Sequence, residues 1–146
     1  MWPYADQISR VRFARKVVPV GGDNCWIWIG AIESDGGYGR FRPVGLPPMA
    51  AHRWSYLAQH GTTDQPVIRH RCDVRVCVKP AHLQAGTQAA NIADTIRRGA
   101  WTTVANNGPR SWPAMSWTLR DLAARGDLTG VAALLDRPTQ LEFTLD

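Results

Sequence analysis

Four side chains in the sequence have the chemistry of a metal site: Cys25, Cys72, Cys77 and His82. The spacing Cys72-x4-Cys77-x4-His82 places three ligands in one loop, and Cys25 comes from a segment far upstream. Three thiolates and one imidazole can complete a closed tetrahedral zinc site with no open position for catalysis. We therefore predict a structural Zn²⁺, which would replace burial that a small chain cannot readily supply. The alternative is that the cysteines are simply small buried residues.

The stretch from Val67 to Ala100 must position most of these ligands, and its pattern predicts a strand, a loop, a second strand and a helix. Val67 and Ile68 lead into His70, and a loop rich in Cys, Arg and Pro follows. The helix is predicted over about 88–98. Thr87 can cap it, because the hydroxyl can accept from a free amide of the first turn, and Gly99 suits the position after its end.

This stretch resembles the ββα-metal motif of HNH endonucleases. The closest type is the small phage and bacterial one, with the pattern H-x-C-D, C-V-x-P-x-H-L, G-T and N-x-x-D. The matching residues are His70, Cys72, Asp73, Cys77, Val78, Pro80, His82, Leu83, Gly86, Thr87, Asn91 and Asp94. The resemblance extends upstream through Cys25–Gly30, Gly37-Tyr38-Gly39 and Ala51-His52-Arg53, and so covers roughly residues 10–100.

The resemblance implies an α+β fold with a small ββα-metal core at about 67–100. An upstream β-hairpin, flanking helices and the structural zinc would surround this core. We expect a nuclease domain over residues 1–105, a linker over 106–115 and a small helical appendage over 116–146.

The resemblance also implies a catalytic site. His70 would be the general base that activates water, since a neutral imidazole suits that task. Asn91 would bind a catalytic divalent cation, Mg²⁺ or another such as Mn²⁺ or Ni²⁺, through its amide oxygen. Asp94 follows Asn91 by three residues on the same helix face, where it could assist the metal, orient His70 or an arginine, or be a solvated carboxylate.

Arg69 departs from the family pattern. Many HNH enzymes have Asp or His immediately before the base as a second metal ligand, and an arginine cannot ligate a cation. Asn91 with waters could hold the metal alone, His52 or Asp73 could help, or activity could be lost. We favour a structural role for His52 and a loop-stabilising role for Asp73.

Many basic residues lie in and around the motif. They either form a solvated surface or contact the phosphates of DNA. Beside a nuclease motif we favour phosphate contact, because such contacts dominate nucleic-acid affinity. For Arg40, which shares a strand face with Arg42, neither reading is preferred. The predicted DNA-binding residues are Arg40, Arg53, Arg69, Arg71, Arg75, Lys79, Arg97 and Arg98.

The charge distribution fits a polyanionic partner. Residues 1–110 carry 14 Lys and Arg against 7 Asp and Glu, whereas residues 111–146 carry 3 against 5. The basic charge thus lies with the motif, and we predict DNA as the partner. No run reaches the length of a membrane helix and no secretory signal is visible, so we expect a cytoplasmic protein of a bacterium or phage.

The remaining segments predict flanking elements. Residues 5–18 are expected to form a helix, residues 25–42 a β-hairpin, and residues 50–60 a helix ended by Gly61. Residues 116–136 predict two short helices around Gly126-Asp127, which pack on the core or form a homodimer contact.

The predicted function is a metal-dependent HNH DNA endonuclease that hydrolyses phosphodiester bonds, nicking as one site or cutting both strands as a dimer. The alternative is a zinc-stabilised DNA-binding module without catalysis, which Arg69 keeps open. A structural or interaction protein would instead show no DNA affinity even at low salt.

Overall fold

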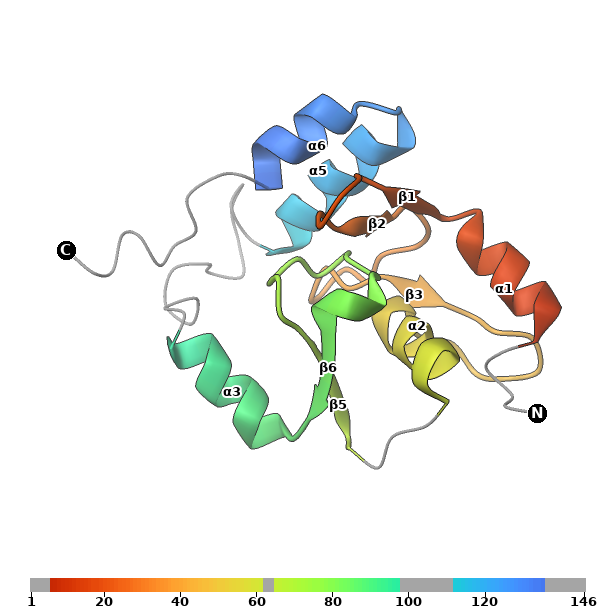
Figure 1. The fold of residues 1–146 in the computed structure, drawn as a ribbon, viewed down its shortest axis with the longest axis vertical. Helices are drawn as coiled ribbons and strands as arrows, with labels where there is room; N and C mark the ends of the chain where they lie inside the picture. Colours follow the sequence, from red (N-terminus) through yellow and green to blue (C-terminus); the bar gives the residue numbers. More distant parts are fainter. Residues whose placement is uncertain (1–5, 62–64, 98–111, 136–146) are drawn as a thin grey trace.

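The computed structural model describes residues 6–61, 65–97 and 112–135. Along these residues, helices alternate with short strands that form three two-stranded antiparallel sheets, β1–β2, β3–β4 and β5–β6 (Figure 1). The fold is mixed α+β, as predicted. The elements are α1 (Gln7–Ala14), β1 (Val17–Pro19), β2 (Trp26–Trp28), β3 (Arg40–Phe41), β4 (Met49–Ala50), α2 (Ala51–His60), β5 (Val67–His70), the 3₁₀ turn η2 (Pro80–His82), β6 (Leu83–Gly86), α3 (Gln88–Arg97), α5 (Trp112–Ala124) and α6 (Leu128–Leu135).

The first helix is shorter than predicted. The carboxylate of Asp6 caps α1 by accepting a hydrogen bond from the Ser9 amide at 2.7 Å. The prediction of a helix over residues 5–18 is wrong beyond Ala14, because Val17–Pro19 form β1 and pair with β2. Two consecutive β-branched valines favour the extended strand over continuation of the helix.

The predicted β-hairpin over residues 25–42 is correct only in part. The chain does reverse within it, since the Arg40 amide donates to the Ala31 carbonyl at 2.8 Å. The strand that begins at Arg40, however, is β3, and it pairs with β4 rather than with β2.

The reason is that both edges of β2 are already occupied. On one side β2 pairs with β1. On the other, the Trp28 amide donates to the Val76 carbonyl at 2.8 Å, and the Val78 amide donates to the Trp26 carbonyl at 2.9 Å. The second partner of β2 is therefore the loop that carries most of the predicted metal ligands.

A cluster of four aromatic side chains joins the elements of the N-terminal half. Phe13 of α1 lies against Trp28 of β2 with ring centroids 4.9 Å apart, and against Trp54 of α2 at 4.5 Å. Phe41 of β3 contacts the other three rings edge-on. This packing fixes α2 and β2 relative to each other, and each of them carries or adjoins a residue of the site described below.

The stretch from Val67 to Arg97 has the predicted order of strand, loop, strand and helix. β5 and β6 pair with His70 opposite Leu83, and α3 follows them. The Thr87 hydroxyl accepts from the Ala90 amide at 3.1 Å, so the predicted helix cap is confirmed. The described helix ends at Arg97, and residues 98–100 lie outside the described residues.

The C-terminal helices pack on the rest of the molecule. α5 begins at Trp112, within the segment predicted as a linker, because Pro113 is tolerated in the first turn of a helix. Leu119, Ala123 and Val131 are buried in the same core as β2. Residues 106–111 of the predicted linker and residues 136–146 of the predicted appendage lie outside the described residues.

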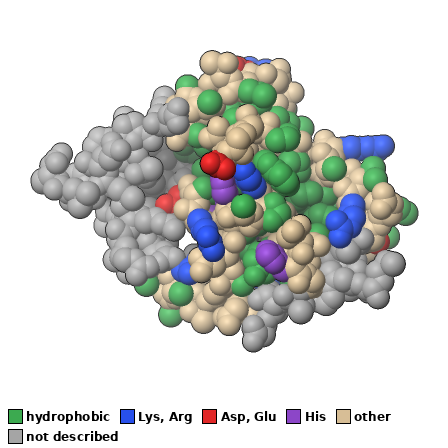
Figure 2. All heavy atoms as spheres, in the orientation of Figure 1, with side chains coloured by type: hydrophobic (Ala, Val, Ile, Leu, Met, Phe, Trp, Pro, Cys, Tyr) green, Lys and Arg blue, Asp and Glu red, His purple; other side chains and the backbone are tan. Residues whose placement is uncertain are grey.

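Lys and Arg side chains lie at separate places on the visible surface (Figure 2). On the face shown in Figure 2, Lys and Arg side chains lie over the β5–β6 region and at the edge where Figure 1 shows α1.

None of the helices in the described parts of the chain combines the length and the apolar composition needed to cross a membrane.

Candidate metal centre

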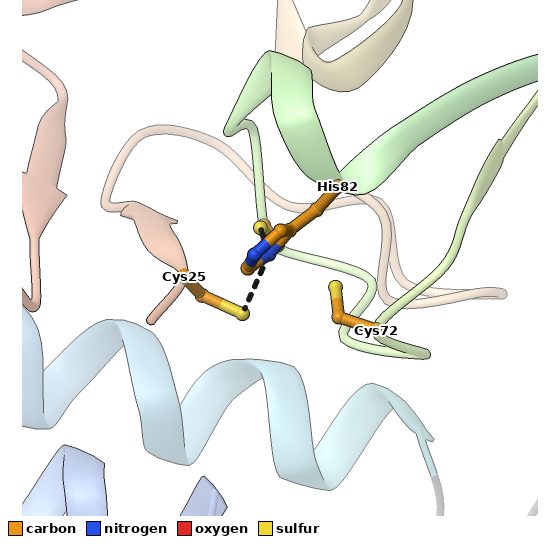
Figure 3. Close-up of side chains that lie close together, drawn as sticks. Cys25, Cys72 and His82 are labelled. Carbon is orange, nitrogen blue, oxygen red and sulfur yellow. Dashed lines mark hydrogen bonds between the residues drawn. The ribbon is translucent and has the colours of Figure 1, made fainter. Parts of the chain in front are cut away.

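The three cysteines and His82 lie together at one point of the fold (Figure 3). Their sulfur and ring-nitrogen atoms all lie within 4.8 Å of one another. Each cysteine is a free thiol; Cys25 and Cys77 are buried, while Cys72 and His82 are half-buried. The predicted ligands therefore form one cluster that can hold a metal ion such as zinc.

Strand-like pairing brings Cys25 to the other ligands. Cys25 directly precedes β2, and Ile27 of β2 forms an antiparallel bridge with Cys77. This bridge continues the hydrogen bonds between β2 and residues 76–78, so Cys25 reaches a loop that is far from it in sequence.

The loop after β5 is folded tightly around the cluster. Asp73 has a φ of 59°, in the left-handed region that Asp tolerates better than most residues. The Arg71 amide donates to the His82 carbonyl at 2.7 Å, and the Cys77 amide donates to the Val74 carbonyl at 3.0 Å. These bonds turn the chain so that Cys72, Cys77 and His82 converge. The loop-stabilising role predicted for Asp73 stays a prediction.

The ring of His82 is oriented for metal binding. Its Nε2 lies 2.9 Å from the Asp23 carbonyl, so Nε2 carries the proton and donates to that oxygen. The Nδ1 lone pair then points at the cluster, 3.6 Å from the sulfur of Cys25 and 3.4 Å from that of Cys77. Zinc–ligand bonds of ordinary length place sulfur and nitrogen about 3.6 Å apart in a tetrahedron. The spacing and the second hydrogen bond on the ring both fit a metal-binding histidine.

Hydrogen bonds among the three thiols move their pKa values in opposite directions. The pKa of Cys77 is lowered to about 4, because the thiols of Cys25 and Cys72 donate hydrogen bonds to its sulfur. The pKa of Cys25 is raised well above its ordinary value, because its hydrogen bonds to Cys72 and Cys77 and its burial keep it protonated. Of the three thiols, Cys77 therefore loses its proton most readily. A divalent cation would replace the remaining protons and balance the thiolates.

The predicted general base lies beside the cluster at the end of β5. His70 is buried, and its Nε2 donates to the Cys77 carbonyl at 2.9 Å, which leaves Nδ1 as the basic nitrogen of the neutral ring. The His70 ring stacks on Tyr38 with centroids 6.0 Å apart and lies 4.4 Å from the ring of His52. Burial, together with the nearby His52, lowers the pKa of His70 well below its usual value, so the ring is neutral at physiological pH.

The other predicted catalytic residues lie on α3, whose first turn faces β5. Arg69 Nη1 donates to the Ala90 carbonyl at 3.2 Å, and Asn91 is the next residue along the helix. The side chains of Asn91, Asp94 and Arg97 lie outside what the structure describes, and Arg98 lies outside the described residues. The roles predicted for these four residues stay predictions.

Several of the predicted DNA-binding side chains hydrogen-bond to backbone carbonyls, which sequence reasoning did not foresee. Arg40 and Arg71 are exposed. The others tie loops together: Arg53 donates to Pro66, Arg69 to Ala90, Arg75 to Gly36, and Lys79 to Gly22 and Asn24. The bonds of Lys79 hold the turn that carries Asp23 against the cluster loop. These four residues therefore have structural contacts whether or not they also contact a phosphate.

Sequence reasoning also missed two parts of the site. The Asp23 carbonyl that orients His82 is a backbone atom and has no signature in the sequence. Tyr38 stands between His70 and the guanidinium of Arg75, which lies 4.8 Å from the Tyr38 ring. In the sequence it belongs to the Gly37-Tyr38-Gly39 part of the resemblance and to the predicted hairpin, and neither indicated this contact.

His52 occupies a position in which a positive charge is costly. Its Nε2 donates to the Ile68 carbonyl at 2.9 Å, and its Nδ1 is buried with no hydrogen-bond partner among the described residues. Burial, aided by the charge of Arg53 and opposed by the Ile68 carbonyl, lowers the pKa of His52 to about 4. The structural role predicted for His52 agrees with these contacts.

We expect this histidine to make folding pH-dependent. Its folded pKa lies below its unfolded pKa of about 6.5, so the unfolded chain binds more protons between these values. The contribution of neutral His52 to the free energy of unfolding is complete above about pH 6.5 and is lost as the pH falls toward 4. Over that window the free energy of unfolding should fall by about 1.4 kcal/mol per pH unit from this residue.

Urea unfolding of the wild type and of His52→Gln from pH 7 to pH 4 measures this effect. The glutamine amide can still donate to the Ile68 carbonyl but does not titrate, so the variant should show a shallower pH dependence. The exposed His60→Gln is the control and should match the wild type. Equal slopes for all three proteins would contradict the expected cost of protonating His52.

The chain matches no protein-family model, no curated protein and no solved structure. The functional conclusion therefore depends on the residues and geometry of the site.

Proposed function

We propose that the chain is a metal-dependent DNA endonuclease of the HNH type, with a structural zinc at Cys25, Cys72, Cys77 and His82. The observation that carries this proposal is the position of His70. It ends the first strand of an antiparallel β5–β6 pair that α3 follows, and it lies directly beside the Cys/His cluster. The order of the motif residues supports the same assignment.

A structural role for the zinc is supported by what the cluster connects. Cys25 adjoins β2, whereas the other three ligands belong to the segment between β5 and β6. This segment contains the short η2 turn but otherwise has little regular structure of its own. A metal bound by four protein ligands would cross-link it to β2, and it would have no open position for a substrate.

In the proposed reaction, His70 accepts the proton of the attacking water. A water oxygen attacks the phosphorus and its proton passes to Nδ1 of His70, while the bond to the leaving sugar oxygen breaks and that oxygen takes a proton from solvent water. The hydrogen bond from Nε2 to the Cys77 carbonyl fixes the ring and keeps the proton off Nδ1 before the reaction. A hard cation such as Mg²⁺, Mn²⁺ or Ni²⁺, held by Asn91, would supply charge stabilisation at the phosphate. Asp94 would assist that cation or orient a neighbouring side chain.

Arg69 has a different task in this proposal. It occupies the position of a second metal ligand in many HNH enzymes, but its guanidinium donates to the first turn of α3. Arg69 thus holds the helix that carries Asn91 against the strand that carries His70. The cation would have Asn91 and waters as its ligands.

Cleavage of supercoiled plasmid tests the function. The wild type is incubated with Mg²⁺, Mn²⁺ or Ni²⁺, with added Zn²⁺ alone, and with no added cation, beside Asn91→Ala. We expect nicked circles with at least one of the first three cations, and a loss of about 10²-fold or more in Asn91→Ala, because the cation loses its protein ligand. A folded wild type that cuts with none of these cations would contradict the proposal.

The same assay separates one-site nicking from paired cutting. Linear product without accumulation of nicked circles would require two sites acting together. A homodimer through the C-terminal helices would provide them, and the exposed Trp117 and Leu128 offer apolar surface for its interface.

The alternative function is a zinc-stabilised DNA-binding module without catalysis. One observation favours it. Arg69 occupies the position of a second metal ligand in many HNH enzymes, but here it donates a hydrogen bond to α3. This alternative predicts full DNA affinity, no cleavage with any cation, and no effect of Asn91→Ala on binding.

A further inference from the structure

Two segments of the chain contain many cations and no acid. Residues 7–18 and 36–61 include no Asp or Glu. The basic residues within them are Arg10, Arg12, Arg15, Lys16, Arg40, Arg42 and Arg53. Such a separation of charge is a feature of surfaces that bind polyanions.

These two segments pack directly on each other. Val44 N donates to the Ser9 hydroxyl at 2.9 Å, and Arg10 Nη2 donates to the Ala58 carbonyl at 3.4 Å. The Arg12 guanidinium lies 5.7 Å from the centre of the Phe41 ring. The charge of both segments is therefore concentrated around α1 and β3, and blue side chains are visible at the edge of Figure 2 where Figure 1 shows α1.

Backbone pairing places the cations at the end of α1 near those of β3. Ile29 N donates to the Lys16 carbonyl at 2.8 Å, and Arg40 N donates to the Ala31 carbonyl at 2.8 Å. The short segment 29–31 therefore hydrogen-bonds to Lys16 at one end and to Arg40 at the other, which brings the end of α1 and the start of β3 to the same segment of the chain. Arg42 follows Arg40 on the same side, with the buried Phe41 pointing the other way.

Four of these side chains are available to a partner. Arg15, Lys16, Arg40 and Arg42 are all exposed. Within the described parts of the chain, none of the four forms an ion pair. We call these four residues the α1–β3 surface.

We propose that the α1–β3 surface binds the phosphate backbone of duplex DNA, without reading its sequence, as a contact additional to the motif. The inference rests on the proposed function for the identity of the partner. Lys and Arg side chains with solvated heads suit phosphate contact, because each contact releases counterions from the duplex. Such a contact would hold DNA while the motif acts on one phosphodiester.

The test is the salt dependence of binding to a duplex of about two helical turns, measured by fluorescence anisotropy without added divalent cation. Two double variants remove the surface in halves, Arg15→Gln with Lys16→Gln and Arg40→Gln with Arg42→Gln. A matched control, Arg120→Gln with Arg125→Gln on α5 and the turn after it, removes the same charge elsewhere. Melting curves and zinc content verify that each variant is folded.

Each surface pair should reduce the slope of log affinity against log salt by about 1.8, since each phosphate contact contributes about 0.9. Its loss of affinity should be larger at about 50 mM than at about 200 mM salt, and equal for two duplexes of unrelated sequence. The control pair should leave the slope close to that of the wild type.

Other outcomes separate this inference from the nuclease proposal. Surface pairs that bind like the control pair would overturn the inference alone. A wild type that does not bind duplex DNA at low salt would overturn both. Reduced slopes in a protein that cuts with no cation would support the α1–β3 surface while contradicting the nuclease.

Discussion

Replacing His82 with alanine should remove the bound zinc and lower the melting temperature by at least about 10 °C. A change of about 1 kcal/mol shifts the midpoint of a chain of this size by roughly 3 °C. Structural zinc contributes on the order of 10 kcal/mol to the folding of small zinc domains, so losing one of four ligands should remove several kcal/mol. Metal analysis and calorimetry on the same preparation measure both quantities.

The physical reason lies in what remains when the metal is lost. Cys25 and Cys77 are buried, and hydrogen bonds from the Cys25 and Cys72 thiols lower the pKa of Cys77. Without a cation a thiolate at Cys77 has no counter-charge in this desolvated place, and the loop loses its cross-link to β2. Lys79 and the β2 bridge would still hold the loop at its edges, so partial rather than complete unfolding is expected.

His60→Ala is the matched control, because His60 is exposed on α2 and is not part of the cluster. It should keep about one zinc per chain and change the midpoint little. Chelation of the wild type should reproduce the effect of His82→Ala, and added Zn²⁺ should reverse it. Unchanged zinc content and unchanged melting in His82→Ala would show that His82 is not a ligand.

The cluster could be predicted from the sequence because ligand chemistry is local. Cys72, Cys77 and His82 lie within one loop, and Cys25 is the only other cysteine in the sequence. The secondary structure of residues 67–97 was predictable for the same reason, since Thr87 and the short apolar runs act on their neighbours. The resemblance to HNH endonucleases added the expected roles of His70 and Asn91, and these stay predictions.

The pairing of the strands could not be predicted in this way. The sequence of Trp26–Trp28 predicts one strand of a hairpin. Which of β1, β3 and the cluster loop pairs with this strand depends on contacts between residues that are distant in sequence. The ties made by Arg53, Arg69, Arg75 and Lys79 were also beyond prediction. Each donates to a backbone carbonyl, and a carbonyl is the same in every residue.

His70→Gln should reduce plasmid cleavage by about 10²- to 10⁴-fold while DNA affinity and zinc content stay close to the wild type. Glutamine can still donate to the Cys77 carbonyl in place of the ring Nε2, so the loop keeps its hydrogen bond. It has no basic nitrogen to accept the proton of the attacking water. His70→Ala should lose the same activity but also stability, because it leaves a cavity and an unpaired carbonyl in a buried place.

The difference between the two variants distinguishes chemistry from folding. His70 lies two residues before Cys72 and donates to Cys77, so any disruption at this position also threatens the metal cluster. An activity loss that follows zinc loss would indicate a structural effect, whereas His70→Gln with full zinc and no cleavage would assign the proton transfer to His70. His60→Gln should cut at the wild-type rate. If a folded, zinc-loaded His70→Gln also cuts at that rate, another group activates the water, and the buried stack of His70, His52 and Tyr38 is then a structural support of β5.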